Sequence, residues 1–276
     1  MPRVLSVILP ASNEEVYIGP CLTALFASRP VPGGAEVVVV ANGCRDATAA
    51  RARAMAGAAK AAGWGFQVLE RAEGGKPGAL NAGDRAANGT MRAYLDADVI
   101  VTPPVMAELA LALEIDRPRY AGATPRIPPA RSFVTRAYAR FWQRLPFAQS
   151  TAPGFGLFAV NAKGRTRWRD FPALISDDTF VRLQFAPEER VQVPGVYDWP
   201  MIEGFAALTR VRRRQDAGVA EIARLYPGLL DREGKAPLGA GRLAGLAAQD
   251  PVGFAVYAAV SVAVRRGKSA GWTRGR

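Results

Sequence analysis

Four short runs of apolar residues, separated by longer Ala-rich stretches, dominate the first hundred residues of the chain. The runs are typical of buried strands and lie at 4–10, 36–42, 65–70 and 91–96. The stretches between them have helical composition and lie at 13–27, 46–62 and 76–87. Strands that alternate with helices pair in parallel, because each helix carries the chain back across the sheet. The alternation predicts an α/β fold with a mostly parallel central sheet flanked by helices.

Polar segments follow each of the four predicted strands. In chain order they read PASNEE, ANGCRD, ERAEGGK and DAD. Parallel α/β sheets bind ligands at the carboxyl ends of their strands, where these segments would meet. The sequence therefore predicts one binding site at this edge, built from several loops.

Two aspartates, Asp96 and Asp98, end the fourth run one residue apart. Residues at positions i and i+2 of a strand share a face, so the two carboxylates would point the same way. Like charges repel unless a cation lies between them or one takes a proton. The pair favours a cation site, and its alternative is a solvated turn at a strand end.

The 276-residue chain contains no histidine and two cysteines, Cys21 and Cys44. Without histidine, acid–base work falls to carboxylates, lysine or tyrosine, and His-ligated zinc is excluded. Two cysteines make neither a disulfide framework nor a metal cluster, which favours a reducing compartment. A strand-like run begins within three residues of the N-terminus, so we expect no signal peptide.

Positive charge is concentrated between Arg117 and Arg169, where eleven Lys or Arg residues and no Asp or Glu occur. Three arginines recur every four residues and would form a stripe on a helix: Arg136, Arg140 and Arg144. Beside the stripe fall Tyr138, Phe141, Trp142 and Leu145. This pattern suits an anionic membrane surface or substrate, and equally a solvated arginine face over core aromatics. We expect no nucleic acid partner, because no nucleic-acid-binding motif accompanies the charge.

The second half of the chain is less regular. A Gly-rich turn enters a predicted strand at 153–161, a helix opens within 175–185, a strand follows at 190–195, and another helix lies near 202–216. We read residues 1–216 as one domain and residues 217–276 as a helical appendage. Within the appendage, the uncharged run 252–264 is too short to span a hydrocarbon core of ~30 Å. It either packs on the core, which we favour, or lies on a membrane surface beside Arg265, Arg266 and Lys268.

The ordered segments ILPASNEE, VVVANGCRDAT, GGKPGALNAG, YLDAD and SDD resemble the family 2 glycosyltransferases, over roughly residues 4–215. These are inverting enzymes of the GT-A fold that use nucleotide-sugar donors. The resemblance implies a nucleotide-sugar-binding half, residues 1–100, and an acceptor half, residues 101–216.

The resemblance also implies a donor site. Mg²⁺ or Mn²⁺ would be held by Asp98, with Asp96 acting through the ribose or a metal-bound water. Lys76 would pair with the diphosphate, and the nucleoside would be bordered by Pro10, Ala11, Asn13 and Glu14. Relatives often carry an aspartate that recognises uracil where this chain has Asn42. We expect Asn42 to bind the donor nucleotide, because its amide offers both a donor and an acceptor to a base. A UDP-sugar is favoured and a GDP-sugar is the second candidate. Outside the family reading, Asn13 and Glu14 would cap the first helix and Lys76 would be a solvated loop lysine.

An inverting transfer needs a base for the acceptor hydroxyl, and without histidine a carboxylate must serve. By resemblance this base is Asp178, with Asp177 as competitor; the alternative is an acidic pair stabilised by a helix dipole. The acceptor side would include Gly154, Phe155 and Gly156. Candidate phosphate contacts are Arg212, Arg213 and Arg214, which lie where relatives carry a Gln-x-x-Arg-Trp motif. The missing tryptophan favours transfer of a single sugar over polymer synthesis.

The sequence thus predicts an inverting, metal-assisted glycosyltransferase whose acceptor is unknown, lipid-linked or anionic, and which works in the cytoplasm, peripheral on the inner membrane face. Two other functions stay open. One is a nucleotidyltransferase that makes a nucleotide sugar, although no triphosphate-binding loop is evident near the first strand. The other is a non-catalytic module that binds a nucleotide or an anionic surface.

Overall fold

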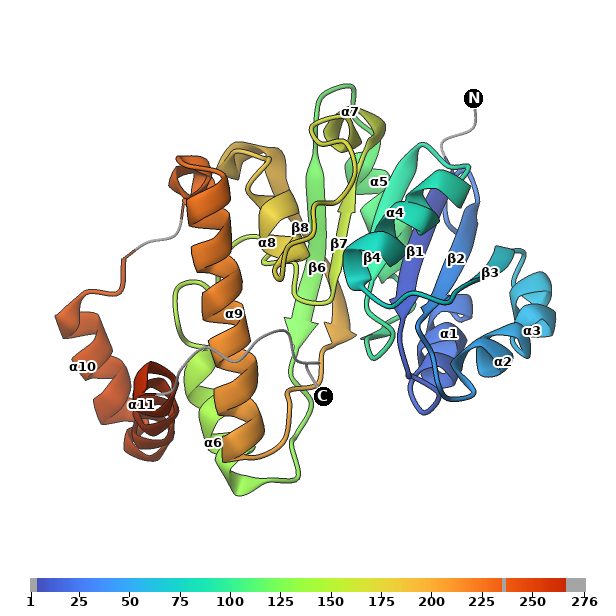
Figure 1. The fold of residues 1–276 in the computed structure, drawn as a ribbon. Helices are drawn as coiled ribbons and strands as arrows, with labels where there is room; N and C mark the ends of the chain where they lie inside the picture. Colours follow the sequence, from blue (N-terminus) through green and yellow to red (C-terminus); the bar gives the residue numbers. More distant parts are fainter. Residues whose placement is uncertain (1–3, 235–236, 267–276) are drawn as a thin grey trace.

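The computed structural model describes residues 4–234 and 237–266, which fold around an eight-stranded sheet (Figure 1). The strand order is β3-β2-β1-β4-β7-β6-β8-β5. The strands are β1 (Leu5–Ala11), β2 (Ala35–Asn42), β3 (Gly65–Arg71), β4 (Met91–Leu95), β5 (Ile100–Val101), β6 (Tyr120–Arg126), β7 (Leu157–Val160) and β8 (Arg190–Asp198). The predicted parallel half is confirmed: β1 pairs in parallel with β2 and β4, and β2 with β3. Beyond it, β7 runs antiparallel to β4 and β6, which makes the sheet mixed.

Helices cover both faces of the sheet. They are α1 (Ile18–Phe26), α2 (Thr48–Arg53), α3 (Ala56–Ala61), α4 (Lys76–Ala86), α5 (Val105–Leu113), α6 (Phe133–Trp142), α7 (Ala162–Arg165), α8 (Asp177–Arg182), α9 (Phe205–Leu225), α10 (Ala240–Gln249) and α11 (Pro251–Arg266). Alternate residues of β1 serve different cores: Val7 packs with α1 and α5, and Ile8 packs with α4. Burial on both faces explains why the first strands read as continuous apolar runs.

Two helix boundaries differ from the sequence prediction. The helix predicted over 13–27 begins only at Ile18, because the chain turns first and Asn13 adopts a positive φ of 54°. The helix predicted over 46–62 is interrupted between α2 and α3, where Met55 N–H donates to the carbonyl of Ala52. This tighter i to i−3 bond ends the first helix before the second begins.

Replacing either of two helical glycines by alanine should change the stability of the fold, in opposite directions for the two sites. An alanine Cβ at Gly83 of α4 would lie 2.5 Å from Ile8 Cγ2, whereas a Cβ at Gly57 of α3 would meet nothing within 4 Å. We expect Gly83→Ala to destabilise the fold by about 1–3 kcal/mol, because α4 must move off β1. We expect Gly57→Ala to stabilise it by about 0.5–1 kcal/mol through helix propensity. Urea unfolding midpoints test both, and a stable Gly83→Ala would contradict the close packing of α4.

The C-terminal helices pack against the acceptor half. Phe254 and Tyr257 of α11 lie against Phe141 of α6, with ring centroids 5.6 and 5.2 Å away. The aromatic residues predicted beside the arginine stripe are buried. Arg140 donates to both carboxylate oxygens of Asp250, at 2.8 and 2.7 Å. The run 252–264 therefore packs on the protein along one face of α11, as we favoured.

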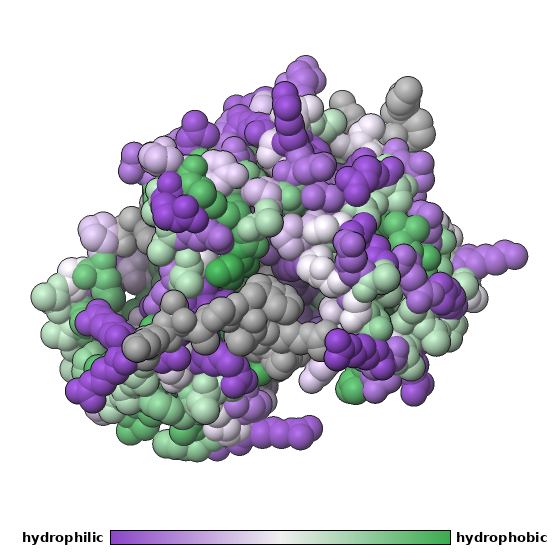
Figure 2. Space-filling model, in the orientation of Figure 1, coloured by the Kyte–Doolittle hydropathy of each residue, from purple (hydrophilic) through white to green (hydrophobic). Residues whose placement is uncertain are grey.

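The division at residue 216 falls inside a helix, since α9 continues without a break to Leu225. Residues 267–276, with Lys268, lie outside the described residues. Over the described ranges, no helix is both long and apolar enough to cross a membrane. Hydrophobic side chains nevertheless gather on the face over α10 and α11 (Figure 2). Two of those exposed on α11 are Val252 and Val262.

Candidate active site

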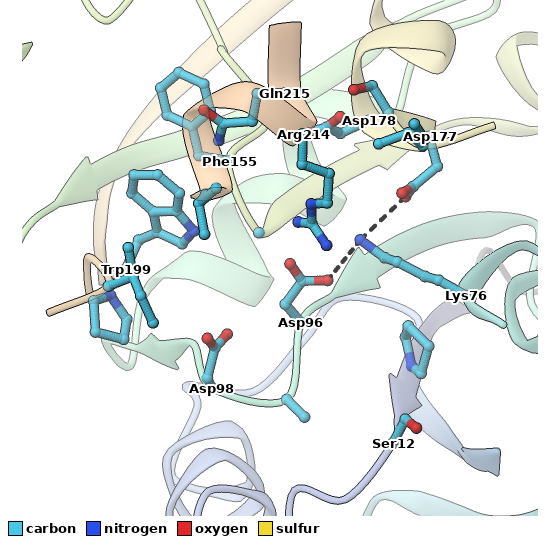
Figure 3. A pocket seen from close by; sticks show the side chains of 18 of the residues that line it. Ser12, Lys76, Asp96, Asp98, Phe155, Asp177, Asp178, Trp199, Arg214 and Gln215 are labelled. Atoms are coloured by element: carbon cyan, nitrogen blue, oxygen red, sulfur yellow. Dashed lines mark ion pairs between the residues drawn. The ribbon is translucent and has the colours of Figure 1, made fainter. Parts of the chain in front are cut away.

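A cavity of about 420 Å³ opens at the carboxyl ends of β1, β2 and β4, where the sequence predicts a binding site (Figure 3). The donor half contributes the loops after these strands and the start of α4. The acceptor half contributes the turn before β7, the start of α8, the segment after β8, and α9. The cavity thus lies between the two predicted halves.

Asp96 and Asp98 both line this cavity. We expected them to point the same way because they would share one face of a strand, and this reason is wrong. β4 ends at Leu95, and the two aspartates lie in a turn closed by a bond from Val99 N–H to the Asp96 carbonyl (3.2 Å). A turn, not strand alternation, aims both side chains inward (Figure 3). The backbone N–H of Asp96 also donates to Gly156, which ties the pair to the acceptor half (2.8 Å).

Lys76, the first residue of α4, bridges the two halves of the site. Its Nζ lies 2.9 Å from Asp96 Oδ1 and 3.2 Å from Asp177 Oδ2 (Figure 3). Burial opposes the charge of Lys76, yet the carboxylates of Asp177 and Asp96 hold its pKa above the usual value. The expectation of a solvated loop lysine is therefore wrong, and Lys76 is a fixed cation in the site.

Asp177 and Asp178 begin α8 at the edge of the cavity. Burial raises the pKa of Asp177 to about 6, against the opposing effect of Lys76. Burial likewise raises the pKa of Asp178, whose Oδ1 accepts a bond from Thr179 N–H (2.7 Å). Asp177 is 6% exposed, whereas Asp178 is half-buried and more open to the cavity. A raised pKa suits a carboxylate that accepts a proton near neutrality.

Asn42 holds a loop instead of facing a nucleobase. The side chain is 2% exposed, and its amide nitrogen donates to the carbonyls of Ala11 (3.0 Å) and Val40 (3.3 Å). Its oxygen accepts from Gly75 N–H (3.0 Å), just before α4. Gly75 adopts φ 125°, a conformation that favours glycine, so Asn42 fixes the turn that presents Lys76. Asn42 also lines the cavity, but both ends of its amide are bonded to backbone groups, so its contact with the donor nucleotide stays a prediction.

Three of the four residues expected at the nucleoside lie in the cavity wall: Pro10, Asn13 and Glu14. Ala11, the last residue of β1, does not line the cavity, because its side chain is 1% exposed and packs in the core. Neither Asn13 nor Glu14 caps α1 through its side chain. Asn13 Oδ1 accepts from Arg45 N–H (2.6 Å), a contact that joins the loops after β1 and β2.

Aromatic side chains form the acceptor side. Phe155 stacks on Trp199 with ring centroids 5.2 Å apart, and both rings lie near Trp142. Gly156 lines the cavity with them, while Gly154 lines a small adjoining pocket beside Asp177 and Asp178. The sequence prediction missed the wall formed by Trp199, Pro200, Met201 and Ile202. The apolar letters WPMI after the last strand were the available signal.

The three arginines of α9 have different surroundings. Arg214 lines the cavity, and Figure 3 shows it pointing toward Asp96. Arg212 also lines the cavity but donates to Asp216 (3.0 Å), Tyr138 (3.3 Å) and Tyr257 (3.4 Å). Arg213 turns away and donates to carbonyls at the end of α11. The prediction that Arg213 contacts phosphate is therefore wrong, and this residue instead holds the end of α11.

A family model, glycosyl transferase family 2, matches residues 6–165, which is more than half of the chain. The chain belongs to this family. Enzymes of this family transfer a sugar from a nucleotide-sugar donor. The family that we predicted from the sequence is confirmed. A comparison with curated proteins finds no match.

Solved structures support the same fold for this glycosyltransferase. The mannosyltransferase PcManGT from Pyrobaculum calidifontis, in complex with GDP-Man and Mn²⁺, is 21% identical with a TM-score of 0.60, covering 97% of this chain and 76% of that one. Glucosyl-3-phosphoglycerate synthase from Mycobacterium tuberculosis, with Mn²⁺, UDP-glucose and phosphoglyceric acid, is 21% identical with a TM-score of 0.54, covering 86% and 82%. S. aureus TarS 1-349 with UDP-GlcNAc is 14% identical with a TM-score of 0.54, covering 96% and 92%. At these identities the likeness shows the GT-A fold.

The carboxylates in this cavity are suited to a hard divalent cation that is bound together with a diphosphate. Within the described ranges, no three His, Cys, Asp or Glu side chains form a cluster that could hold a metal alone. Asp96 and Asp98 supply oxygen donors at one end of the cavity. Mg²⁺ and Mn²⁺ suit one or two carboxylates completed by phosphate oxygens and water. The site is open to a cation that arrives with the donor.

Proposed function

We propose that this glycosyltransferase moves one sugar, with inversion, from a nucleoside-diphosphate sugar to an acceptor hydroxyl, assisted by Mg²⁺ or Mn²⁺. One observation carries the proposal: Lys76 lies between Asp96 of the donor half and Asp177 of the acceptor half. The same cavity thus holds carboxylates suited to a cation and a carboxylate pair suited to proton transfer. Membership of the family favours sugar transfer over the making of a nucleotide sugar.

The donor end neutralises the leaving group. Asp98, with Asp96, would hold the cation, which when bound offsets the charge of the departing diphosphate. Lys76 is already protonated in the site, and Arg214 points into the same space. These two cations would orient the diphosphate and stabilise the charge that develops as the bond to the sugar breaks.

At the acceptor end, Asp178 is our candidate base. It takes the proton from the acceptor hydroxyl as the oxygen attacks the anomeric carbon and the bond from that carbon to the diphosphate oxygen breaks. Asp177 is the second candidate, but it is more buried and its Oδ2 faces Lys76 at 3.2 Å. Because the Lys76 ammonium holds Asp177 Oδ2, that oxygen is already engaged when an acceptor hydroxyl enters the cavity.

A UDP-sugar stays the favoured donor, with a GDP-sugar second. The amide of Asn42 is committed to the turn before α4, so it does not choose between the two bases. Solved structures of similar fold contain UDP-GlcNAc, UDP-glucose or GDP-Man, which covers both classes. The loop after β1, where Asn13 and Glu14 line the cavity, is the part of the wall that we expect to contact the base.

Thermal unfolding with a panel of nucleoside diphosphates, with and without Mn²⁺, tests the donor site. We expect one nucleotide at a hundred times its dissociation constant to stabilise the wild type by ~2.7 kcal/mol, only with metal present. Asp98→Asn should lose this gain, because an amide replaces an ionised ligand of the cation. Asp170→Asn, at an exposed aspartate outside the cavity, is the matched control and should keep it. A chain that no nucleotide stabilises would overturn the proposal.

A further inference from the structure

Two exposed phenylalanines mark one edge of the acceptor half. Phe133 is the first residue of α6 and 60% exposed, and Phe205 is the first residue of α9 and 42% exposed. Figure 1 shows both helices starting at the same lower end of the molecule, toward which the arrowheads of β6 and β8 also point. Each ring exposes apolar surface to water at the start of its helix, and covering that surface would be favourable. We call the residues Phe133 and Phe205 the phenylalanine edge.

The phenylalanine edge is held rigidly. Thr135 Oγ1 of α6 donates to the Ile202 carbonyl (3.2 Å) and accepts from Gly204 N–H (2.8 Å) just before α9. The Glu203 carboxylate accepts from the N–H groups of Arg131 (2.7 Å) and Ser132 (2.9 Å). These four bonds join the first turns of the two helices. The exposure of the rings therefore comes from the fold and not from a loose loop.

Positive charge surrounds the phenylalanine edge. Arg131 and Arg136 flank Phe133 in the sequence, Arg210 lies five residues after Phe205 in α9, and all three are exposed. Glu203 is the acidic residue between the two helices, and two backbone N–H groups hold its pKa below the usual value. Three cations against one anion, on a chain of net charge +12, match a negatively charged surface.

The segment between β8 and α9 connects this edge to the cavity. Trp199, Met201 and Ile202 line the cavity wall, and Phe205 follows three residues later on the outside. Only Glu203 and Gly204 separate this cavity wall from Phe205 along the chain. A surface that covers the edge would lie directly beside the acceptor side of the active site.

We propose that the phenylalanine edge inserts into the headgroup region of an anionic lipid bilayer and so brings the acceptor side of the cavity to the membrane surface. Aromatic rings flanked by arginines are the chemistry that an anionic bilayer interface accepts. The occupant we favour is an anionic bilayer and not a second protein, because exposed arginines accompany the two rings on a chain of net charge +12. The inference rests on the edge itself and does not require the donor chemistry proposed above.

Co-sedimentation of the full chain with vesicles tests the inference. We expect binding to mixed phosphatidylcholine–phosphatidylglycerol vesicles and little binding to phosphatidylcholine alone. The double variant Phe133→Ser/Phe205→Ser should bind the mixed vesicles at least ~10-fold more weakly, since both apolar anchors are lost. Leu111→Ser, at a 57% exposed leucine of α5, is the matched control and should bind as the wild type does.

Three results would overturn the inference. The wild type could fail to bind mixed vesicles, or the double variant could bind them as tightly as the wild type, which would leave the arginines acting alone. In the third result the wild type, but not the double variant, is a dimer in lipid-free solution, which would assign the edge to a second copy. The nucleotide-dependent thermal shift of the same preparations separates this failure from failure of the donor site.

Discussion

Replacing Asp178 by asparagine is expected to lower the turnover number by about a thousandfold, the size of effect that general base catalysis supplies. An asparagine oxygen can still accept the bond that Thr179 N–H donates to Asp178, so α8 keeps its start. The variant should also keep metal-dependent nucleotide binding, because Asp96 and Asp98 are unchanged. Steady-state release of the nucleoside diphosphate, with the thermal shift as binding control, measures both properties.

Asp177→Asn is the matched comparison for the base. If Asp178 is the base, Asp177→Asn should reduce turnover much less, since Asp177 mainly partners Lys76. The opposite order of effects would reassign the base to Asp177. The pH dependence gives a second readout: a base must be ionised, and the pKa of Asp177 is raised to about 6 and that of Asp178 is raised as well. We therefore expect kcat/KM to begin to fall, as the pH decreases, at a higher pH than it would with a base of ordinary aspartate pKa.

The parallel half of the sheet was predictable because short, mostly apolar strands alternate with Ala-rich helical stretches and each strand is followed by a polar segment. β6 (Tyr120–Arg126) was missed, since its residues YAGATPR include two alanines and a glycine, which lack the usual strand signal. Its strand conformation comes from pairing with β7 and β8, which are distant in sequence. Contacts of this kind are set by tertiary packing and leave little local trace.

Within the site, sequence reasoning found side chains that carry charge and missed those that shape the cavity. Asp96, Lys76 and Asp177 were singled out because their residue types suit phosphate and proton chemistry. Trp199 was missed, because a tryptophan after a strand looks like ordinary core until its partner Phe155 is placed. The direction of the Asn42 amide was equally hidden, since it depends on the position of Gly75 from another loop.

Lys76→Met should destabilise the fold in a manner that depends on pH. The substitution removes the cation from two ion pairs, one of them to the buried Asp177. Breaking a buried pair costs about 3–5 kcal/mol, and we expect about 3 kcal/mol at pH 8 because Lys76 is itself a third exposed. Methionine keeps much of the apolar stem, so the loss reports charge more than packing.

The sign of the pH dependence follows from Asp177. Its pKa is about 6 in the fold against 3.8 ordinarily, so the folded state holds more protons and this group costs stability as pH rises through that range. Without Lys76 the pKa must rise further, which extends the cost to higher pH. Near pH 5 Asp177 is mostly protonated with or without the lysine, so its ion pair with Lys76 no longer contributes and the loss caused by Lys76→Met should be smaller than at pH 8. Urea unfolding at pH 5 and pH 8 measures the difference, with Lys60→Met at an exposed lysine of α3 as control. An equal loss at both pH values would show that the ion pair with Asp177 does not supply the stabilisation that Lys76 gives.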